Sequence, residues 1–192
     1  MRVGVLALQG AFREHVRMLE AAGASALAVR LPGQLEGCAG LVIPGGESTA
    51  IAKLMRTYGF YDAIAAAHAA GMAVWGTCAG AILMAGEVLG ARPDQEPLAL
   101  MSMVVRRNAY GRQVDSFEAD LQIAHVGTYR GVFIRAPLIE SVGASVEVLA
   151  MHGDRIVAAR EGCLMATTFH PELTGDDRLH RYFLEHVVAA ST

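Results

Sequence analysis

A cysteine set between glycines is the part of this sequence with the clearest capacity for chemistry. Cys78 lies in the run Gly76-Thr77-Cys78-Ala79-Gly80, directly after the apolar stretch Met72–Trp75. The pattern is typical of a nucleophile elbow, a sharp strand-to-helix turn that presents one reactive side chain at the top of a sheet. We therefore predict that Cys78 is a nucleophile. A single cysteine is more often a small buried apolar residue, and that is how we interpret Cys38 and Cys163.

A nucleophilic cysteine needs a base, and the downstream run His170-Pro171-Glu172 supplies a candidate. His170 would take the thiol proton, and Glu172 would orient the imidazole and favour its charged form. Taken alone, this run could equally be a loop with a solvated acid. Together with Cys78 it favours a Cys-His-Glu triad. In such a triad a thiolate attacks a carbonyl carbon and forms first a tetrahedral oxyanion and then a thioester.

The oxyanion needs preorganised donors, and two parts of the sequence can provide them. The backbone N–H of Ala79, the residue after the nucleophile, is the first. We expect the second from another strand-end loop, Pro44-Gly45-Gly46-Glu47-Ser48, because a glycine there can turn its N–H inward. The same loop also reads as an ordinary strand-to-helix connection in which Ser48 caps the next helix, and the two roles are compatible.

The elements that must position these residues alternate between strand and helix in the first half of the chain. Apolar runs predict strands over Val3–Leu8, Ala26–Val29, Gly40–Ile43 and Met72–Trp75. Helical spacing predicts helices over Phe12–Ala22, Thr49–Arg56, Phe60–Ala70 and Ala79–Ala85. Such alternation favours a largely parallel sheet covered on both faces, with a site beyond the carboxyl ends of its strands.

From about Leu98 the pattern changes to strands with few helices between them. The expected strands are Met101–Val105, Gly131–Ile134, Val146–Met151, Arg155–Ala159 and Cys163–Thr168, and a final helix covers Arg178–Ala189. A hairpin turn is expected at His152-Gly153-Asp154. We find no repeat and no linker, so residues 1–192 are expected to form one domain. The predicted fold class is α/β, a three-layer sandwich around a central, mostly parallel but mixed sheet.

The composition excludes several classes of function. The 192 residues carry a net charge of −3, which leaves no basic surface for nucleic acid. No apolar run reaches the roughly 18 residues of a membrane-spanning helix, and the start of the chain has no signal-peptide pattern. Three cysteines at unrelated spacings do not make a disulfide framework, so we expect a cytoplasmic protein.

The sequence predicts neither a metal nor a cofactor. The histidines other than His170 show no metal-ligand spacing, and we expect structural or surface roles for them. The run Gly45-Gly46-Glu47-Ser48 lacks the lysine that a phosphate-binding loop needs. We therefore expect no bound metal and no bound cofactor.

The Gly-Gly-Glu-Ser loop, the cysteine elbow and Phe169-His170-Pro171-Glu172 together resemble the class I, or triad, glutamine amidotransferases. Those proteins hydrolyse glutamine and pass ammonia to a synthase, and their fold is flavodoxin-like. The resemblance is closest to the branch that serves pyridoxal 5′-phosphate synthase, in vitamin B6 biosynthesis. It rests on four blocks spread along the chain: Leu6–His15, Arg107–Glu118, Gly131–Pro137 and Phe169–Thr174.

The resemblance also implies roles for individual residues. Cys78 would be the nucleophile, His170 the base and acid, and Glu172 the orienting group. The residues implied to contact glutamine are Gly46, Glu47, Ser48, Arg107, Ile134 and Arg135, with Gly46 and Ala79 at the oxyanion. Free glutamine carries a carboxylate and an ammonium group, which cationic side chains and acceptors can bind. The alternative for the two arginines is a plain surface charge.

The implied partners are L-glutamine and the lyase subunit of the synthase, in a large hetero-oligomer. Two other functions remain open. One is a cysteine peptidase or γ-glutamyl hydrolase, which uses the same chemistry on a larger substrate. At 192 residues the chain leaves little room for a polymer-binding groove. The other is a regulatory subunit with a decayed site, which the intact Cys78, His170 and Glu172 disfavour.

Overall fold

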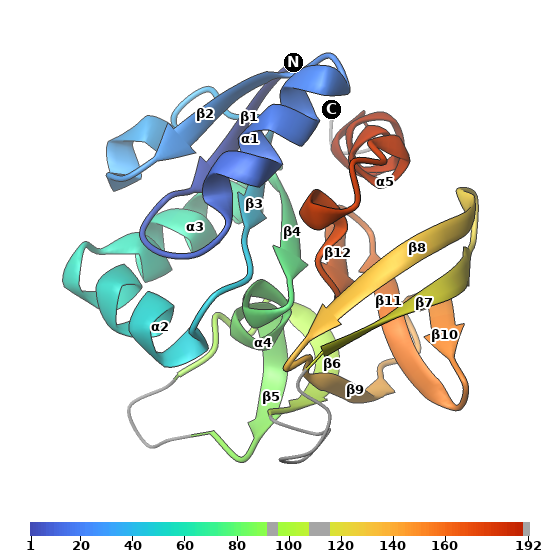
Figure 1. Ribbon diagram of the computed structural model, residues 1–192. Coiled ribbons are helices and arrows are strands. Elements are labelled where there is room, and N and C mark those ends of the chain that lie inside the picture. The colour runs from blue at the N-terminus through green and yellow to red at the C-terminus, as the bar shows by residue number, and fades with distance from the viewer. Residues whose placement is uncertain (92–95, 108–115, 190–192) are drawn as a thin grey trace.

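A central sheet organises the molecule, and five of its strands are mutually parallel (Figure 1). The computed structural model describes residues 1–91, 96–107 and 116–189. The parallel strands, in their order across the sheet, are β2 (Ser25–Val29), β1 (Arg2–Leu6), β3 (Gly40–Ile43), β4 (Ala73–Thr77) and β12 (Leu164–Thr167). Strands β3, β4 and β12 are buried along their whole length, as expected for parallel strands covered on both faces. We call these five strands the parallel half.

The sheet continues beyond β12 with mainly antiparallel neighbours, which we call the antiparallel half. Across the sheet come β11 (Arg155–Glu161), β9 (Leu138–Val142), β6 (Met101–Arg106) and β5 (Ala85–Leu89), and β10 (Glu147–His152) pairs with β11. Of these pairings, the one between β5 and β6 is parallel and the others are antiparallel. A separate two-stranded sheet, β7 (Ser116–Ile123) and β8 (Gly127–Ile134), completes this half.

Helices cover both faces of the sheet and divide the core into two apolar clusters. The first face carries α2 (Ser48–Thr57), α3 (Phe60–Ala69) and α4 (Ala79–Met84), which pack on Leu41, Ile43 and Val74. The opposite face carries α1 (Phe12–Ala21), α5 (Arg178–Tyr182) with its π-helical continuation Phe183–Val188, and the β7–β8 ribbon. Their apolar side chains meet Val42, Trp75 and Met165. This is the predicted three-layer arrangement with a mixed sheet (Figure 1).

Most predicted elements are present, with end points that differ by a few residues. The hairpin turn is confirmed, since β10 ends at His152 and β11 begins at Arg155. Three strands were not predicted, namely β5, β7 and β9. The final helix is α-helical only to Tyr182 and then widens to a π-helix. Residues 108–115, in the Arg107–Glu118 block, lie outside the described residues.

The predicted cap of α2 is wrong by one residue. Glu47, not Ser48, is the N-cap, and its carboxylate accepts hydrogen bonds from the N–H groups of Thr49 (3.0 Å) and Ala50 (2.7 Å). Ser48 is instead the first helical residue and is buried. The glutamate side chain reaches two of the free N–H groups of the first turn, where its charge also suits the helix dipole.

Candidate active site

Cys78 occupies a strained turn between β4 and α4. Its φ is 49° and its ψ is −103°, a backbone conformation that residues with a side chain rarely adopt. The Cys78 N–H donates to the carbonyl of Thr167 on β12, 2.8 Å away, which ties the turn to the neighbouring strand. Gly76 and Gly80 make the turn possible. A Cβ on Gly76 would come within 2.5 Å of the Gly80 backbone, and a Cβ on Gly80 would collide with the Ile43 carbonyl.

His170 and Glu172 follow β12, the strand beside β4, so the base and the nucleophile meet at one edge of the sheet. The Nδ1 of His170 lies 2.8 Å from Glu172 Oε1, and both residues are buried. Burial alone would lower the pKa of His170, but hydrogen bonds and charge from Cys78 and Glu172 outweigh it and raise that pKa to about 10. The site therefore favours an imidazolium beside the sulfur at neutral pH.

Glu172 is held as a carboxylate deep in the protein. Burial alone would raise its pKa, but the imidazoles of His15 and His170 outweigh that effect and keep the pKa well below its usual range. His15 Nε2 lies 3.2 Å from Glu172 Oε2, so the carboxylate stands between two histidines. Sequence reasoning missed this contact and gave His15 only a general structural or surface role. Its position just after the β1 turn, at the same sheet edge as the other groups, was the available signal.

The Gly45-Gly46 segment borders both Cys78 and His170. A Cβ on Gly45 would lie 2.9 Å from His170 Nδ1 and 3.3 Å from the Cys78 Cβ, so only glycine fits there. The Gly45 N–H donates to Thr77 Oγ1 (3.1 Å), and the Gly45 carbonyl accepts from the Ala11 N–H (3.3 Å). Because the Gly45–Gly46 peptide is trans, the Gly46 N–H points opposite to that carbonyl.

The predicted site residues surround one cavity of about 230 Å³. Its walls are formed by Gln9, Gly46, Glu47, Ser48, Cys78, Ala79, Ile82, Arg107, Ile134, Arg135 and His170. Every sequence candidate is among them except Glu172, which lies behind His170. Gln9 and Ile82 were not predicted as wall residues. Gln9 accepts the Glu47 N–H through its side-chain oxygen at 2.9 Å, so it fixes the loop after β3.

Two arginines bring positive charge to this cavity from the antiparallel half. Arg107 directly follows β6, and its guanidinium lies 3.3 Å from Thr49 Oγ1 and 3.8 Å from the Glu47 carboxylate. Arg135 follows β8 and has a φ of 44°. Ile134, the last residue of β8, offers its carbonyl oxygen 3.9 Å from Cys78 Sγ. The two halves of the molecule therefore meet at Cys78.

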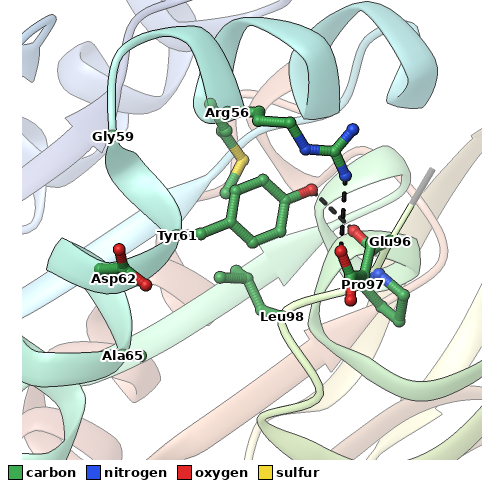
Figure 2. A pocket seen from close by; sticks show the side chains of 9 residues that line it. Arg56, Gly59, Tyr61, Asp62, Ala65, Glu96, Pro97 and Leu98 are labelled. Carbon is green, nitrogen blue, oxygen red and sulfur yellow. Dashed lines mark hydrogen bonds and ion pairs between the residues drawn. The ribbon is translucent and has the colours of Figure 1, made fainter. Parts of the chain in front are cut away.

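A second, larger cavity of about 390 Å³ lies away from Cys78, between α2, α3 and residues 96–98 (Figure 2). Its polar groups bind each other. The Tyr61 hydroxyl donates to the Glu96 carbonyl (2.6 Å), and the Arg56 guanidinium lies 3.5 Å from the Glu96 carboxylate. Among the described residues, neither a cysteine nor a histidine lines it. We therefore assign the chemistry to the smaller cavity.

Within residues 1–91, 96–107 and 116–189, no cluster of three or more histidine, cysteine, aspartate or glutamate side chains could hold a metal ion. In the same part of the chain, no helix has both the length and the apolar character needed to cross a membrane.

Comparison with known proteins gives a consistent family. The model of the SNO glutamine amidotransferase family matches residues 5–189. The pyridoxal 5′-phosphate synthase subunit PdxT of Pelotomaculum thermopropionicum is 55% identical over 192 residues, covering 99% of this chain and 97% of the relative. The same-named subunit of Roseiflexus sp. strain RS-1 is 54% identical over 187 residues, covering 96% and 99%.

Solved structures show the same fold. A crystal structure of a glutamine amidotransferase has a TM-score of 0.92 at 52% identity and covers 97% of this chain and 98% of its own. A putative GMP synthase protein from Thermoplasma acidophilum, at 16% identity, has a TM-score of 0.68, with 99% and 94% covered, and supports the fold alone. The expected class I glutamine amidotransferase fold is thereby confirmed. With a match that runs nearly from end to end, the chain belongs to the SNO glutamine amidotransferase family.

Proposed function

We propose that this chain is the glutaminase subunit of a pyridoxal 5′-phosphate synthase. It hydrolyses L-glutamine to glutamate and ammonia in the cytoplasm, acts as one domain over residues 1–192, and delivers the ammonia to the synthase. One observation carries the proposal: the small cavity gathers a cysteine in an elbow, a histidine paired to a buried carboxylate, and two arginines. Family membership supports the same reaction.

The reaction begins at Cys78. The thiolate attacks the side-chain amide carbon of glutamine, and the C=O electrons move to oxygen. As the tetrahedral intermediate collapses, the C–N bond breaks and His170 gives its proton to the departing nitrogen, which leaves as ammonia. Water then attacks the thioester while His170 takes a proton from it. Glutamate leaves, and the thiolate–imidazolium pair is restored. Glu172 holds the imidazole orientation throughout.

Backbone N–H groups stabilise the oxyanion in this scheme. Ala79 begins α4, so its N–H is free of the helix ladder and adds the positive end of the helix dipole. Gly46 would supply the second N–H from the loop after β3. Removal of one such donor typically costs about 3 kcal/mol of transition-state stabilisation.

The dimensions and charges of the cavity favour a free amino acid. At about 230 Å³ the cavity suits a small molecule and not an extended chain, which argues against a peptidase. Arg107 and Arg135 would bind the α-carboxylate, and Glu47 with Ser48 would bind the α-ammonium group. Ile134 would pack on the side-chain carbons.

The partner follows from chemistry and from the relatives. Ammonia released into water is lost, so hydrolysis is useful only when a receiving enzyme is docked. The relatives are named as subunits of pyridoxal 5′-phosphate synthase. We propose the same assembly here, a large hetero-oligomer in which the synthase activates the glutaminase. The Gly45-Gly46 peptide can change orientation at low steric cost, and partner contact near Gln9 would select the active orientation.

The test is ammonia release from glutamine by the purified chain, with increasing amounts of the synthase. We expect a low rate without the synthase, a saturating rise in kcat with it, and no activity for the Cys78→Ala control. Full kcat without the synthase would overturn the coupling. Turnover by Cys78→Ala would overturn the whole assignment.

A further inference from the structure

The buried histidine behind the triad has no role in the scheme above. We propose that His15 is a positioning residue that holds the Glu172 carboxylate in register with His170 and connects it to the loop that supplies the oxyanion donor. This inference rests on the proposed glutaminase function.

The contacts of His15 place it at a junction. The side chain of this α1 residue is fully buried, and its Nε2 faces two partners, Thr77 Oγ1 at 3.1 Å and Glu172 Oε2 at 3.2 Å. Its Nδ1 lies 3.0 Å from Nε2 of His180 on α5. Its ring and that of Trp75 pack in a T-shaped arrangement, with ring centroids 5.8 Å apart. Three elements distant in sequence therefore fix one imidazole.

The hydrogen-bond network determines which nitrogen of His15 carries the proton. If Nε2 were bare, its lone pair would face the carboxylate of Glu172 at 3.2 Å. If Nδ1 donated to His180, then His180 would carry its own proton on Nδ1, which has no partner and is buried. A buried N–H without an acceptor is costly. We therefore place the proton of His15 on Nε2, where it donates to Thr77 Oγ1 and lies beside Glu172 Oε2, and Nδ1 of His15 accepts a hydrogen bond from Nε2 of His180.

The second carboxylate oxygen of Glu172 depends on His15. Glu172 Oε2 is buried and accepts no hydrogen bond from the part of the chain that the structure describes, so the imidazole 3.2 Å away is the polar group placed to stabilise it. Burial lowers the pKa of His180, so the ring that donates to His15 is uncharged.

The same junction reaches the oxyanion loop. Thr77 Oγ1, which contacts His15 Nε2, also accepts the Gly45 N–H at 3.1 Å. One imidazole thus touches the acid of the triad directly and the Gly45-Gly46 segment through one hydroxyl. Displacement of His15 would disturb the base and the oxyanion loop together.

A pH experiment on this site reports on the titratable and charged groups that face His15 and His170. The titratable groups that face His15 are His180 from α5 and Glu172 from the 3₁₀ turn Pro171–Leu173, whereas β4 contributes only Trp75 and Thr77. His170 faces Cys78 and Glu172, and the charged groups across the cavity are Glu47, Arg107 and Arg135.

The deciding comparison is His15→Gln against His15→Asn. A glutamine amide reaches the place of Nε2 and can still donate to Glu172. An asparagine amide reaches only the place of Nδ1, so it keeps a bond to His180 and loses Glu172. The readouts are the pH dependence of Cys78 alkylation by iodoacetamide, which needs neither glutamine nor synthase, and kcat for ammonia release with saturating synthase.

We expect His15→Gln to keep the wild-type alkylation midpoint. In His15→Asn the midpoint should move to higher pH, because a poorly held carboxylate supports the imidazolium less. Its kcat should fall by about 10- to 150-fold, the range for one lost polar contact to a charged group, with KM changed less than about 3-fold.

Leu19→Val is the matched control, since Leu19 lies one turn further along α1 and is fully buried. It should lower thermal stability without moving the alkylation midpoint. Equal midpoints and equal kcat for His15→Asn and wild type would overturn the positioning role. A different result separates the two proposals. If the wild-type protein releases no ammonia but the alkylation midpoint still moves in His15→Asn, then the positioning role of His15 stands and the glutaminase assignment is overturned.

Discussion

The two halves of the sheet contribute different things to the site. The parallel half delivers Cys78 after β4, His170 after β12 and Gly46 after β3, all at one edge of neighbouring strands. The antiparallel half delivers Arg107 after β6 and Ile134 at the end of β8. The reacting groups thus all come from neighbouring parallel strands, whereas the arginine and Ile134, which would hold the carboxylate and the side chain of the substrate, come from a wall built separately.

This difference leads to an expectation about kinetics. Changes to the reacting groups of the parallel half should affect kcat, because they alter the geometry of bond making and breaking. Changes in the antiparallel half should affect mainly KM, because they alter how glutamine is held. The following predictions test that separation, in order of expected size.

The largest loss should follow Cys78→Ala. Removal of the nucleophile should reduce kcat by several orders of magnitude, and His170→Ala should be as severe because triad members act as a unit. Cys78→Ser is expected to be inactive as well. Steady-state ammonia release measures the effect, and circular dichroism checks that the fold is intact. More than about a tenth of wild-type kcat in Cys78→Ala would refute the role of the sulfur.

Glu172→Ala should reduce kcat less than Cys78→Ala does, because Glu172 orients the base and favours its charged form without reacting itself. Without its charge the pKa of His170 should fall from about 10, so the imidazolium is lost at lower pH and stabilises the thiolate less. Alkylation of Cys78 by iodoacetamide should then be slower than in wild type at the same pH. An unchanged alkylation profile with wild-type turnover would contradict this role.

Arg107→Ala and Arg135→Ala should weaken glutamine binding with little effect on kcat. Loss of one charge-assisted hydrogen bond is worth about 1.5–3 kcal/mol, or roughly 10- to 150-fold in kcat/KM. Arg106→Ala is the matched control, because Arg106 pairs with Glu140 and does not line the cavity. If all three variants share wild-type kinetics, the first two arginines are surface charges.

The smallest effect concerns Glu47, which caps α2 in the parallel half and lies 3.8 Å from Arg107 of the other half. Glu47→Ala should lower the free energy of unfolding by about 1 kcal/mol at pH 7, the usual value of an N-cap. Burial would raise the pKa of Glu47, but its backbone hydrogen bonds outweigh it and lower that pKa below 4.5. The stabilisation is therefore complete above pH 4.5 and is lost as the pH falls through the folded-state value.

Denaturant unfolding of wild type and Glu47→Ala at pH 7 and at acid pH measures this difference. The gap between the two proteins should shrink on acidification. A gap that grows at low pH would contradict the assignment of the carboxylate as the cap.

The parallel half could be predicted from sequence to within a few residues, and physical reasons explain why. Continuous apolar runs mark buried strands, and Gly76 and Gly80 mark a turn that only glycine permits. The antiparallel half was harder to predict. Strands β7 and β9 are partly exposed, so their apolar signal is weak, and β5 follows α4 without a break.

Within the candidate site, the sequence predicts the residues that line the cavity. It does not predict the residues that hold them in place, such as His15. Cys78 and His170 predict each other because a nucleophile needs a base. The place of His15 just after the β1 turn puts it at the same edge of the sheet as the site, but nothing local shows that it will face Glu172. That contact arises only when α1 and the turn after β12 pack together. The N-cap was misassigned because both Glu47 and Ser48 are suitable and only the backbone path decides between them.

The pairing of β4 with β12 has a consequence for how the chain is made. Cys78 is synthesised well before its N–H partner Thr167 and its base His170. Contacts between segments so far apart in sequence require a long loop to close. A nascent chain that has not yet reached β12 therefore holds a thiol without its base. We expect the ability to consume glutamine to arise only when β12 has joined the sheet, so that a product truncated before β12 does not consume the amino acid.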